Sequence, residues 1–234
     1  KGRYGNVVGQ TILTDACPNR CAGGKYGDQV WQTTESNACK NCVAGRYDNE
    51  QGQANSCPLQ CPPGKYGTAT GKTSAVDACT KCVAGKYSNQ HGVTSCKLCS
   101  TNTFQNEEDK TSCKNCPAGT QNEFGSDSTP GTRDELGDCE VCPTGKYKSA
   151  SDGTACAQCA KGRYGNVVGQ TTLEAACDSQ CPGGKYGDQI GQTSESNACK
   201  NCVAGRYDND QGQVDFCDGV CFKGRYGNVV GQTS

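Results

Sequence analysis

The chain has few of the residues that build a hydrophobic core. Methionine is absent, and tryptophan and histidine occur once each. Leucine, isoleucine, valine and phenylalanine together make up 26 of the 234 residues, about 11% of the chain. That share is well under the roughly 20% below which chains usually fail to form a core. One large globular domain is therefore not expected.

Net charge and long apolar runs are missing as well. The formal net charge is only −1, whereas disordered chains of low hydrophobicity carry a high net charge. Nucleic-acid binding needs a concentrated basic surface. No apolar run approaches the ~20 residues that span a bilayer. These absences argue against disorder, a nucleic-acid partner and a membrane span in this segment.

Cysteine is what the chain has in place of a core. Its 22 cysteines form eleven couples, seven of the form C-x-x-C and four of the form C-x-x-x-C. The couples are separated by 13, 14 or 17 residues, with one exception of 22. Such density is typical of disulfide scaffolds outside the cytosol. The sequence predicts many small disulfide scaffolds in series, located extracellularly or at the cell surface.

One phrase returns after each couple: two variable residues, then glycine, lysine or arginine, and tyrosine. A second glycine usually follows five residues after the tyrosine. All ten tyrosines occupy the aromatic position, and Phe104 fills it once, whereas Gln121 replaces it in one unit. The repeat aromatics are Tyr4, Tyr26, Tyr47, Tyr66, Tyr87, Phe104, Tyr147, Tyr164, Tyr186, Tyr207 and Tyr226.

Each unit is predicted to be a small hairpin closed by a disulfide. The first glycine permits positive φ, the basic–aromatic dipeptide is extended, and a Gly-Asp, Gly-Asn or Asp-Asn turn follows. The chain then returns through Gln-Thr toward the next cysteine. Closing a loop of ~15 residues contributes about 3 kcal/mol in the chain-entropy model. We expect the tyrosine ring to pack on a disulfide or on the neighbouring unit.

Spacing alone does not fix which cysteines are joined. We favour a bond from the second cysteine of each couple to the first cysteine of the next, with bridging inside each couple as the alternative. Zinc knuckles are another alternative, because Cys82 through Cys99 has zinc-compatible spacing. An unbroken series of eleven couples with varied spacing suits disulfides better, and no cofactor is expected.

No catalytic arrangement is visible. His91 lies in a turn without a recurring nucleophile or carboxylate partner, and we interpret it as a solvated residue. The acidic turns 48–50 and 208–210 lack the spaced oxygen ligands of a dedicated calcium loop, so at most weak binding is expected there. We predict that the chain is not an enzyme.

The phrase C-x-x-C-x-x-G-[KR]-Y, with a cysteine 13 to 17 residues later, resembles the ephrin-receptor-like cysteine-rich repeat. It is also similar to the first sub-module of tumour-necrosis-factor-receptor domains. The segments 61–66 and 142–147 are the closest matches. The resemblance implies an elongated extracellular rod of tandem short β-hairpins with almost no helix, a small disulfide-rich fold. It implies no particular ligand.

The resemblance also implies forward pairing, since in that family the cysteine before the P-x-G-x-Y phrase is bonded to the next one along. Ten rings in series follow. Cys17 and Cys221 would pair with the continuing or an adjacent chain. The expected pairs are Cys21–Cys39, Cys42–Cys57, Cys61–Cys79, Cys82–Cys96, Cys99–Cys113, Cys116–Cys139, Cys142–Cys156, Cys159–Cys177, Cys181–Cys199 and Cys202–Cys217.

A longer repeat overlies the short one. Residues 1–61 and 161–221 align without gaps and are identical at 44 of 61 positions, and residues 223–233 repeat residues 1–11. We divide the chain into a partial ring (1–17), two rings (18–61), three rings (62–116), a long irregular ring (117–139), two rings (140–177), two rings duplicating 18–61 (178–221) and a partial ring repeating 1–11 (222–234).

Two aromatic residues break the pattern. Phe124 lies in the irregular ring, and Trp31 replaces the glycine whose counterpart is Gly191. Local packing or a tolerated insertion is one interpretation, and a lateral contact is the other. Because no N-x-S/T sequon occurs, any sugar would be O-linked. Exposed turns containing Thr33, Thr73 and Thr193 are the O-glycosylation sites that we expect.

Two function classes fit these features. The first is a structural component of an extracellular filament, cell-surface hair or matrix fibre built from further copies of the chain, with glycans as further partners. The second is the stalk or ligand-binding ectodomain of a large receptor or adhesion protein. Receptor modules usually diverge, whereas near-identical repeats suit an interface used many times along an axis. We therefore favour the filament.

Overall fold

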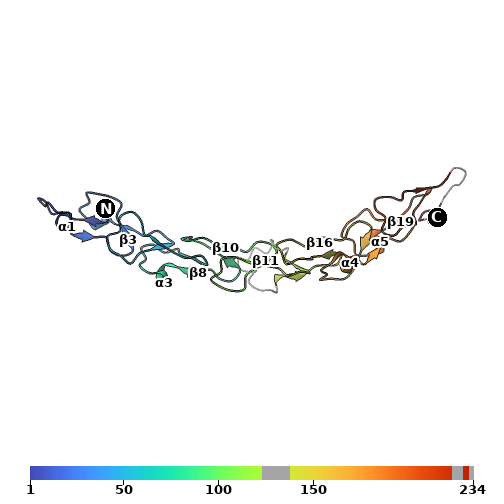
Figure 1. The fold of residues 1–234 in the computed structure, drawn as a ribbon, viewed down its shortest axis with the longest axis horizontal. Coiled ribbons are helices and arrows are strands. Elements are labelled where there is room, and N and C mark those ends of the chain that lie inside the picture. Colours follow the sequence, from blue (N-terminus) through green and yellow to red (C-terminus); the bar gives the residue numbers. More distant parts are fainter. Residues whose placement is uncertain (123–137, 223–228, 232–234) are drawn as a thin grey trace. The chain divides into compact units, whose positions relative to one another are not determined.

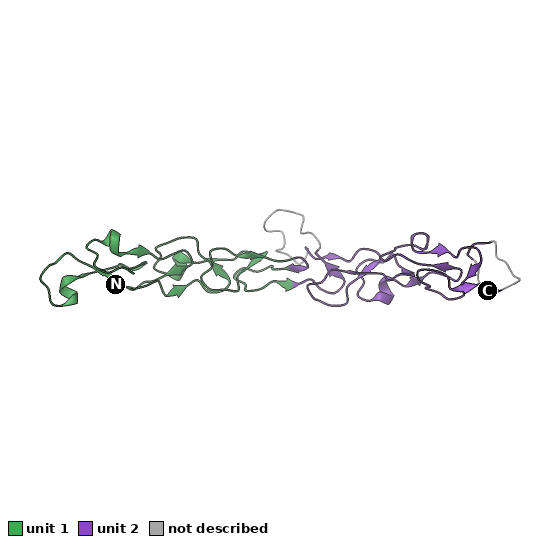
Figure 2. Ribbon diagram, turned by 90° about the horizontal axis from the view of Figure 1, so that it is seen from above, with its two compact units in different colours: residues 1–100, 104–114, 128–136 green, residues 101–103, 115–127, 137–234 purple. Residues whose placement is uncertain are grey.

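The computed structural model describes residues 1–122, 138–222 and 229–231. Its regular structure there consists of two-residue strands and four-residue helices (Figure 1). The described residues belong to two units, the first with residues 1–100 and 104–114 and the second with residues 101–103, 115–122, 138–222 and 229–231 (Figure 2). The fold is disulfide-rich and built from small hairpins, as expected.

Ten disulfides close ten rings, which we number from the N-terminus. Each expected pair is present, from Cys21–Cys39 in ring 1 to Cys202–Cys217 in ring 10. Cys17 and Cys221 have no partner within the chain. Residues 1–17 form a further loop of the same kind, here called ring 0.

One antiparallel hairpin accompanies each ring. In rings 0 to 5 the pairs are β1 (Arg3–Tyr4) with β2 (Asn19–Arg20), β3 (Lys25–Tyr26) with β4 (Lys40–Asn41), β5 (Arg46–Tyr47) with β6 (Leu59–Gln60), β7 (Lys65–Tyr66) with β8 (Thr80–Lys81), β9 (Lys86–Tyr87) with β10 (Lys97–Leu98), and β11 (Thr103–Phe104) with β12 (Lys114–Asn115). In rings 6 to 10 they are β13 (Thr120–Gln121) with β14 (Glu140–Val141), β15 (Lys146–Tyr147) with β16 (Ala157–Gln158), β17 (Arg163–Tyr164) with β18 (Ser179–Gln180), β19 (Lys185–Tyr186) with β20 (Lys200–Asn201), and β21 (Arg206–Tyr207) with β22 (Gly219–Val220).

The second strand of each hairpin lies between the two cysteines of the next couple. In ring 1, Tyr26 is opposite Lys40 and Lys25 is opposite Asn41. The disulfides hold their Cα atoms 5.4 to 5.9 Å apart, close to the spacing of a hydrogen-bonded strand pair. The residues beside each disulfide are therefore placed to pair.

The Gln-Thr return segment joins neighbouring rings, a contact that the sequence did not lead us to expect. It forms single parallel bridges to the aromatic residue of the preceding ring, as in Tyr26–Gln53 and Tyr164–Gln192. The disulfide already joins the ends of each ring, so the return segment is free to join neighbouring rings.

We call the first cysteine of each ring the opening cysteine and the second the closing cysteine. A four-residue helix precedes the closing cysteine in ring 0, where it is Cys17, and in every ring whose cysteines are 18 residues apart. The aromatic of these rings is followed by glycine, which makes room for the helix: a Cβ on Gly67 would lie 2.5 Å from the carbonyl oxygen of Ala78. The helices are α1 (Leu13–Ala16), α2 (Glu35–Ala38), α3 (Ala75–Ala78), α4 (Leu173–Ala176) and α5 (Glu195–Ala198).

Rings whose cysteines are 14 or 15 residues apart have no helix, and a polar side chain takes its place. This side chain follows the aromatic residue directly and is at most 3% exposed in each ring. The residues are Asp48, Ser88, Gln105, Lys148 and Asp208. The residue after the aromatic therefore indicates which of the two ring types forms.

Cystine forms most of the interior. Among the described residues, the buried apolar side chains are cysteines, four helix alanines and Phe104, whereas no valine, leucine or isoleucine is buried. Ala38, Ala78, Ala176 and Ala198 are the four alanines, each next to a closing cysteine. This distribution agrees with the shortage of aliphatic residues in the sequence.

The helix-containing rings give a first prediction. Gly67→Ala should destabilise ring 3 by about 1–3 kcal/mol, because the new methyl group overlaps the Ala78 carbonyl. Gly153→Ala is the matched control, since the nearest atom to a Cβ there is 4.0 Å away. Hydrogen exchange of the peptide 67–79 should accelerate only in the first variant. Equal exchange in both variants would show that the glycine does not accommodate the helix.

Candidate functional site: the interface between successive rings

Up to three backbone hydrogen bonds join one ring to the next among the described residues. Between rings 1 and 2, the Gly24 N–H donates to the Asp48 carbonyl (2.7 Å), and the Gly52 N–H donates to the Cys21 carbonyl (2.8 Å). The third bond runs from the Gly27 N–H to the Gln53 carbonyl (2.8 Å). Donors and acceptors are main-chain N–H and carbonyl groups, so the bonds depend on the backbone conformation of the two rings and not on a particular polar side chain.

The same bonds recur within both units. In the second unit the Gly184 N–H donates to the Asp208 carbonyl (2.8 Å) and the Gly187 N–H to the Gln213 carbonyl (2.8 Å). The bond from the second glycine to the opening cysteine of the preceding ring has six counterparts elsewhere: Gly71 to Cys42, Gly92 to Cys61, Gly169 to Cys142, Gly191 to Cys159, Gly212 to Cys181 and Gly231 to Cys202. The interface is thus repeated nearly unchanged.

Rings also touch their second neighbours. Gly24 has φ +78°, and a Cβ at this position would lie 2.4 Å from the carbonyl oxygen of Gly71, two rings further on. The same close approach joins Gly45 to Gly92 and Gly162 to Gly212. Only glycine combines this backbone conformation with this proximity. The two glycines of the repeat are therefore the two sides of one contact.

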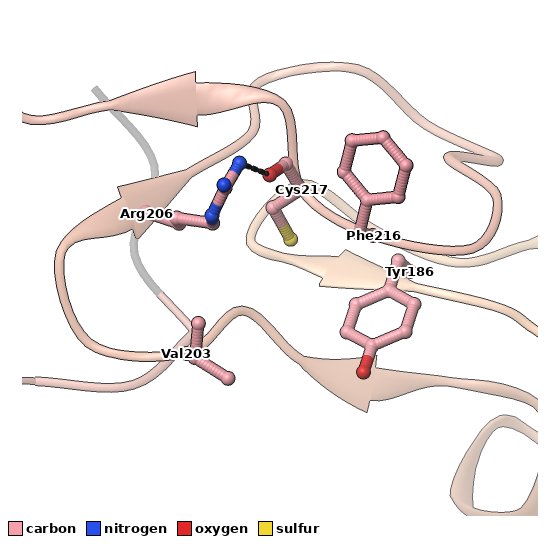
Figure 3. Close-up of a pocket in the computed structure, with 5 residues that line it drawn as sticks. All are labelled: Tyr186, Val203, Arg206, Phe216 and Cys217. Carbon is pink, nitrogen blue, oxygen red and sulfur yellow. Dashed lines mark hydrogen bonds between the residues drawn. The ribbon is translucent and has the colours of Figure 1, made fainter.

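Tyrosine packs forward onto the next disulfide. Tyr147 of ring 7 lies against Cys159, Cys177 and Ala176 of ring 8. Tyr186 of ring 9 lines an open pocket of about 280 Å³ together with Val203, Arg206, Phe216 and Cys217 (Figure 3). The Tyr147 side chain thus packs on a neighbouring cystine, as the sequence predicted, and Tyr186 shares a pocket with the closing cysteine of the next ring. Tyrosine contributes the apolar surface that each ring lacks.

Arginine ties the strand to the closing cysteine. Arg206 donates from Nη1 to the Cys217 carbonyl (2.9 Å), the bond drawn in Figure 3, and its guanidinium lies 5.9 Å from the Phe216 ring centroid. Arg46 makes the same bond to the Cys57 carbonyl (2.9 Å). The bond is therefore shared by both copies of the long repeat, whereas the contact with Phe216 belongs to one, because Ser56 is its counterpart.

Ion pairs are duplicated as well. Lys25 Nζ lies 2.6 Å from Glu35 Oε1, and the counterparts Lys185 and Glu195 are also 2.6 Å apart. Lys40 pairs with Asp28 at 2.8 Å, and Lys200 pairs with Asp188. Hydrogen bonding from the lysine lowers the pKa of Asp28 and of Asp188, and hydrogen bonding to the aspartate raises the pKa of Lys40 and of Lys200.

Polar side chains replace glycine and the aromatic in the first rings of the second unit. Asn102 takes the first-glycine position at φ +59°, and its Oδ1 accepts the Asn122 N–H (2.9 Å). Gln121, at the aromatic position, is buried and accepts the Cys156 N–H (2.8 Å). At these two positions, side-chain hydrogen bonds replace the contacts that glycine and tyrosine make in other rings.

Lys148 completes this polar segment. Its Nζ donates to the carbonyls of Cys116 (3.2 Å) and Asp152 (2.8 Å), although the residue is only 3% exposed. Burial lowers the pKa of this lysine. Cys116 is the first cysteine of the preceding ring, and the ammonium group donates to its carbonyl. In other rings the N–H of the second glycine donates to the corresponding carbonyl. Sequence reasoning missed this role, and the residue after the aromatic was the available signal.

The other residues singled out from the sequence lie at the surface or outside the described residues. Trp31 is 95% exposed, Thr33 and Thr73 are exposed, and Thr193 is half-buried. His91 is an exposed turn residue. Phe124 and Tyr226 lie outside the described residues. Within the described ranges, no three or more histidine, cysteine, aspartate or glutamate side chains gather as metal ligands.

Comparison with known families adds one match. Residues 85–129 match the family described as tyrosine-protein kinase ephrin type A/B receptor-like. The match starts in ring 4, and the same ring pattern and ten serial disulfides extend along the chain. The chain is an ephrin-receptor-like cysteine-rich repeat protein. No curated protein matches it significantly.

Ephrin-receptor-like repeats are a non-catalytic, extracellular type of module. Together with ten disulfides, which persist in oxidising compartments, the match indicates an extracellular or cell-surface location. In the parts of the chain that the structure describes, no helix has the length and apolar character needed to cross a bilayer.

The close glycine contact gives a second prediction. Gly24→Ala should lower the stability of the folded chain more than Gly205→Ala. Both positions have φ near +80°, but a Cβ at Gly205 would meet nothing within 4 Å. The overlap at Gly24 should add about 1–3 kcal/mol. Urea unfolding of both variants measures the difference, and equal losses would contradict the second-neighbour contact.

The lysine–aspartate pairs predict a pH dependence. Because the pKa of Asp28 and of Asp188 is lowered in the folded chain, these carboxylates stabilise it above about pH 4, and that stabilisation disappears as the pH falls through the lowered pKa values. Rings 1 and 9 should then exchange amide hydrogens faster. The variant Asp28→Asn/Asp188→Asn should lack this change below pH 4, and an unaltered acid response in it would refute the assignment.

Proposed function

We propose that the chain is a structural component of an extracellular filament made from further copies of its own repeat. The observation that carries the proposal is the ring-to-ring interface. It consists of backbone bonds that run in both directions across a junction and recur between most successive rings of the described chain. A head-to-tail interface of this kind generates an open filament when the rotation between copies does not close.

Conservation within the chain supports the same proposal. Residues 1–61 and 161–221 keep 44 of 61 positions, and the retained residues include both ion pairs and the arginine bond to the closing cysteine. A spacer needs only the ring pattern. Retention of surface ion pairs favours a surface that is used more than once.

The second candidate is the stalk or ligand-binding ectodomain of a receptor. The match of residues 85–129 to an ephrin receptor-like family is the observation in its favour. Such a role requires a face that differs from ring to ring. The polar segment at the start of the second unit, with Asn102, Gln121 and Lys148, is one place where the chain departs from its own repeat.

Electron microscopy and non-reducing electrophoresis test the proposal. Concentrated, oxidised protein should form filaments, and electrophoresis should give a ladder of multiples of 24.5 kDa that reductant collapses. Cys17→Ser/Cys221→Ser should lack the ladder, because these two cysteines have no partner within the chain. Isolated particles at every concentration, with no ladder, would contradict the filament and favour the receptor stalk.

A further inference from the structure

The interior of the array follows a rule for the position five residues after the aromatic. In ring 9 this position is Gly191, and a Cβ there would lie 3.2 Å from the side chain of Gln158, in the couple that closes ring 7. Gly71 lies in the same way beside Asn41, and Gly212 beside Gln180. The glycine at this position therefore lies beside the residue that directly precedes the second cysteine of a couple. That couple closes the ring two positions earlier in the series.

Trp31 occupies this position in ring 1. Its backbone has φ +62°, a conformation that is strained for a bulky residue, and its side chain is 95% exposed. A side chain so exposed gains little packing from the described residues to offset that strain. Its counterpart Gly191 has no room for an indole beside Gln158. A tryptophan at this position therefore needs a different neighbour, one that is smaller and apolar.

The end of ring 10 offers such a neighbour. The last residue inside its couple is Val220, where the first copy of the long repeat has Gln60, and the residue before it is Gly219 in place of Leu59. Val220 pairs with Arg206, which lines the open pocket. We call the four exposed residues Val203, Phe216, Val220 and Phe222 the apolar face. Of these, Val203 and Phe216 line the pocket.

The changes on the two surfaces match each other. Ring 1 differs from its copy, ring 9, at four positions, and Trp31 in place of glycine is the largest change. Ring 10 and the couple that closes it differ from the first copy at seven positions, among them Phe216 in place of Ser56 and Val220 in place of Gln60. Leu98 and Val141 are the other apolar residues at the Val220 position, and Val141 lies beside Gly169.

Resting on the proposed filament, we infer that Trp31 of one copy packs on the apolar face of a second copy, against Val220 and the pocket beside it. The spacing agrees with the interior rule if ring 0 of the second copy takes the place that residues 229–231 hold in the single chain, where the Gly231 N–H donates to the Cys202 carbonyl. Trp31 then faces the couple that closes the ring two before it, as Gly191 does.

Burial of the indole gives the joint its strength. Tryptophan dominates interfaces when it is buried beside other aromatic groups and arginine, and Phe216 and Arg206 supply both at the pocket (Figure 3). The indole would remove Val220 and Phe216 from water at the same time. The joint between copies is therefore expected to be apolar, whereas interior junctions rely on backbone bonds.

Trp31 is the only tryptophan of the chain, so its fluorescence reports on this contact alone. In assembled protein its emission should shift to shorter wavelength, and acrylamide should quench it less than in dilute protein. Trp31→Gly, Phe216→Ser and Val220→Gln each restore the residue of the other copy. Each should raise the concentration needed for assembly at least about tenfold, the effect of losing an interface hot spot.

Controls separate this contact from folding and from the filament itself. Trp31→Gly should raise the thermal stability of the unassembled chain, because glycine relieves the strained backbone. Val76→Ser, which removes another exposed apolar side chain, should leave assembly unchanged. Filaments in which the indole stays exposed and the three variants assemble normally would overturn the contact and leave the filament standing. Absence of filaments at any concentration would overturn both.

Discussion

The whole structure depends on the disulfide that closes each ring. With about 11% of large aliphatic residues and phenylalanine, a unit of this size cannot bury enough surface to order its backbone. The disulfide removes that requirement by joining the ends of the ring and by placing the residues beside it at pairing distance. Two residues of strand per side then suffice, and the remaining backbone groups are available to the next ring.

Glycine and tyrosine complete what the disulfide begins. The first glycine of one ring meets the second glycine two rings further on, and the tyrosine between them covers the next cystine. Each ring is therefore stabilised by both neighbours, as in other one-dimensional arrays. Apart from the glycines and the aromatic residue, most of the interface is made by backbone groups, which explains how the exposed residues can vary while the ring pattern persists.

Much of this arrangement could be predicted from the sequence, because cysteine spacing and the Gly-[KR]-Tyr phrase are local signals. The short hairpins and the forward tyrosine packing follow from them. The partner of the Gln-Thr segment could not be predicted, since bonding between rings depends on how they stack. The helices α1 to α5 were missed for another reason: four residues are too few for a periodic pattern, although the glycine after tyrosine and the alanine before cysteine signal them together.

The candidate site was predicted less completely than the fold. Lys148, Asn102 and Gln121 look like departures from a consensus in the sequence, and only their hydrogen bonds reveal that they replace glycine and tyrosine contacts. Trp31 was recognised as exceptional from the sequence, but the surface that suits it became apparent only from the second-neighbour rule.

Disulfide mapping of the oxidised protein tests the central claim most directly. Proteolysis without reduction, followed by mass spectrometry, should recover peptides that join the second cysteine of each couple to the first cysteine of the next, for example Cys42 with Cys57 and Cys61 with Cys79. Peptides in which the two cysteines of one couple are bridged to each other would contradict the serial rings and everything built on them.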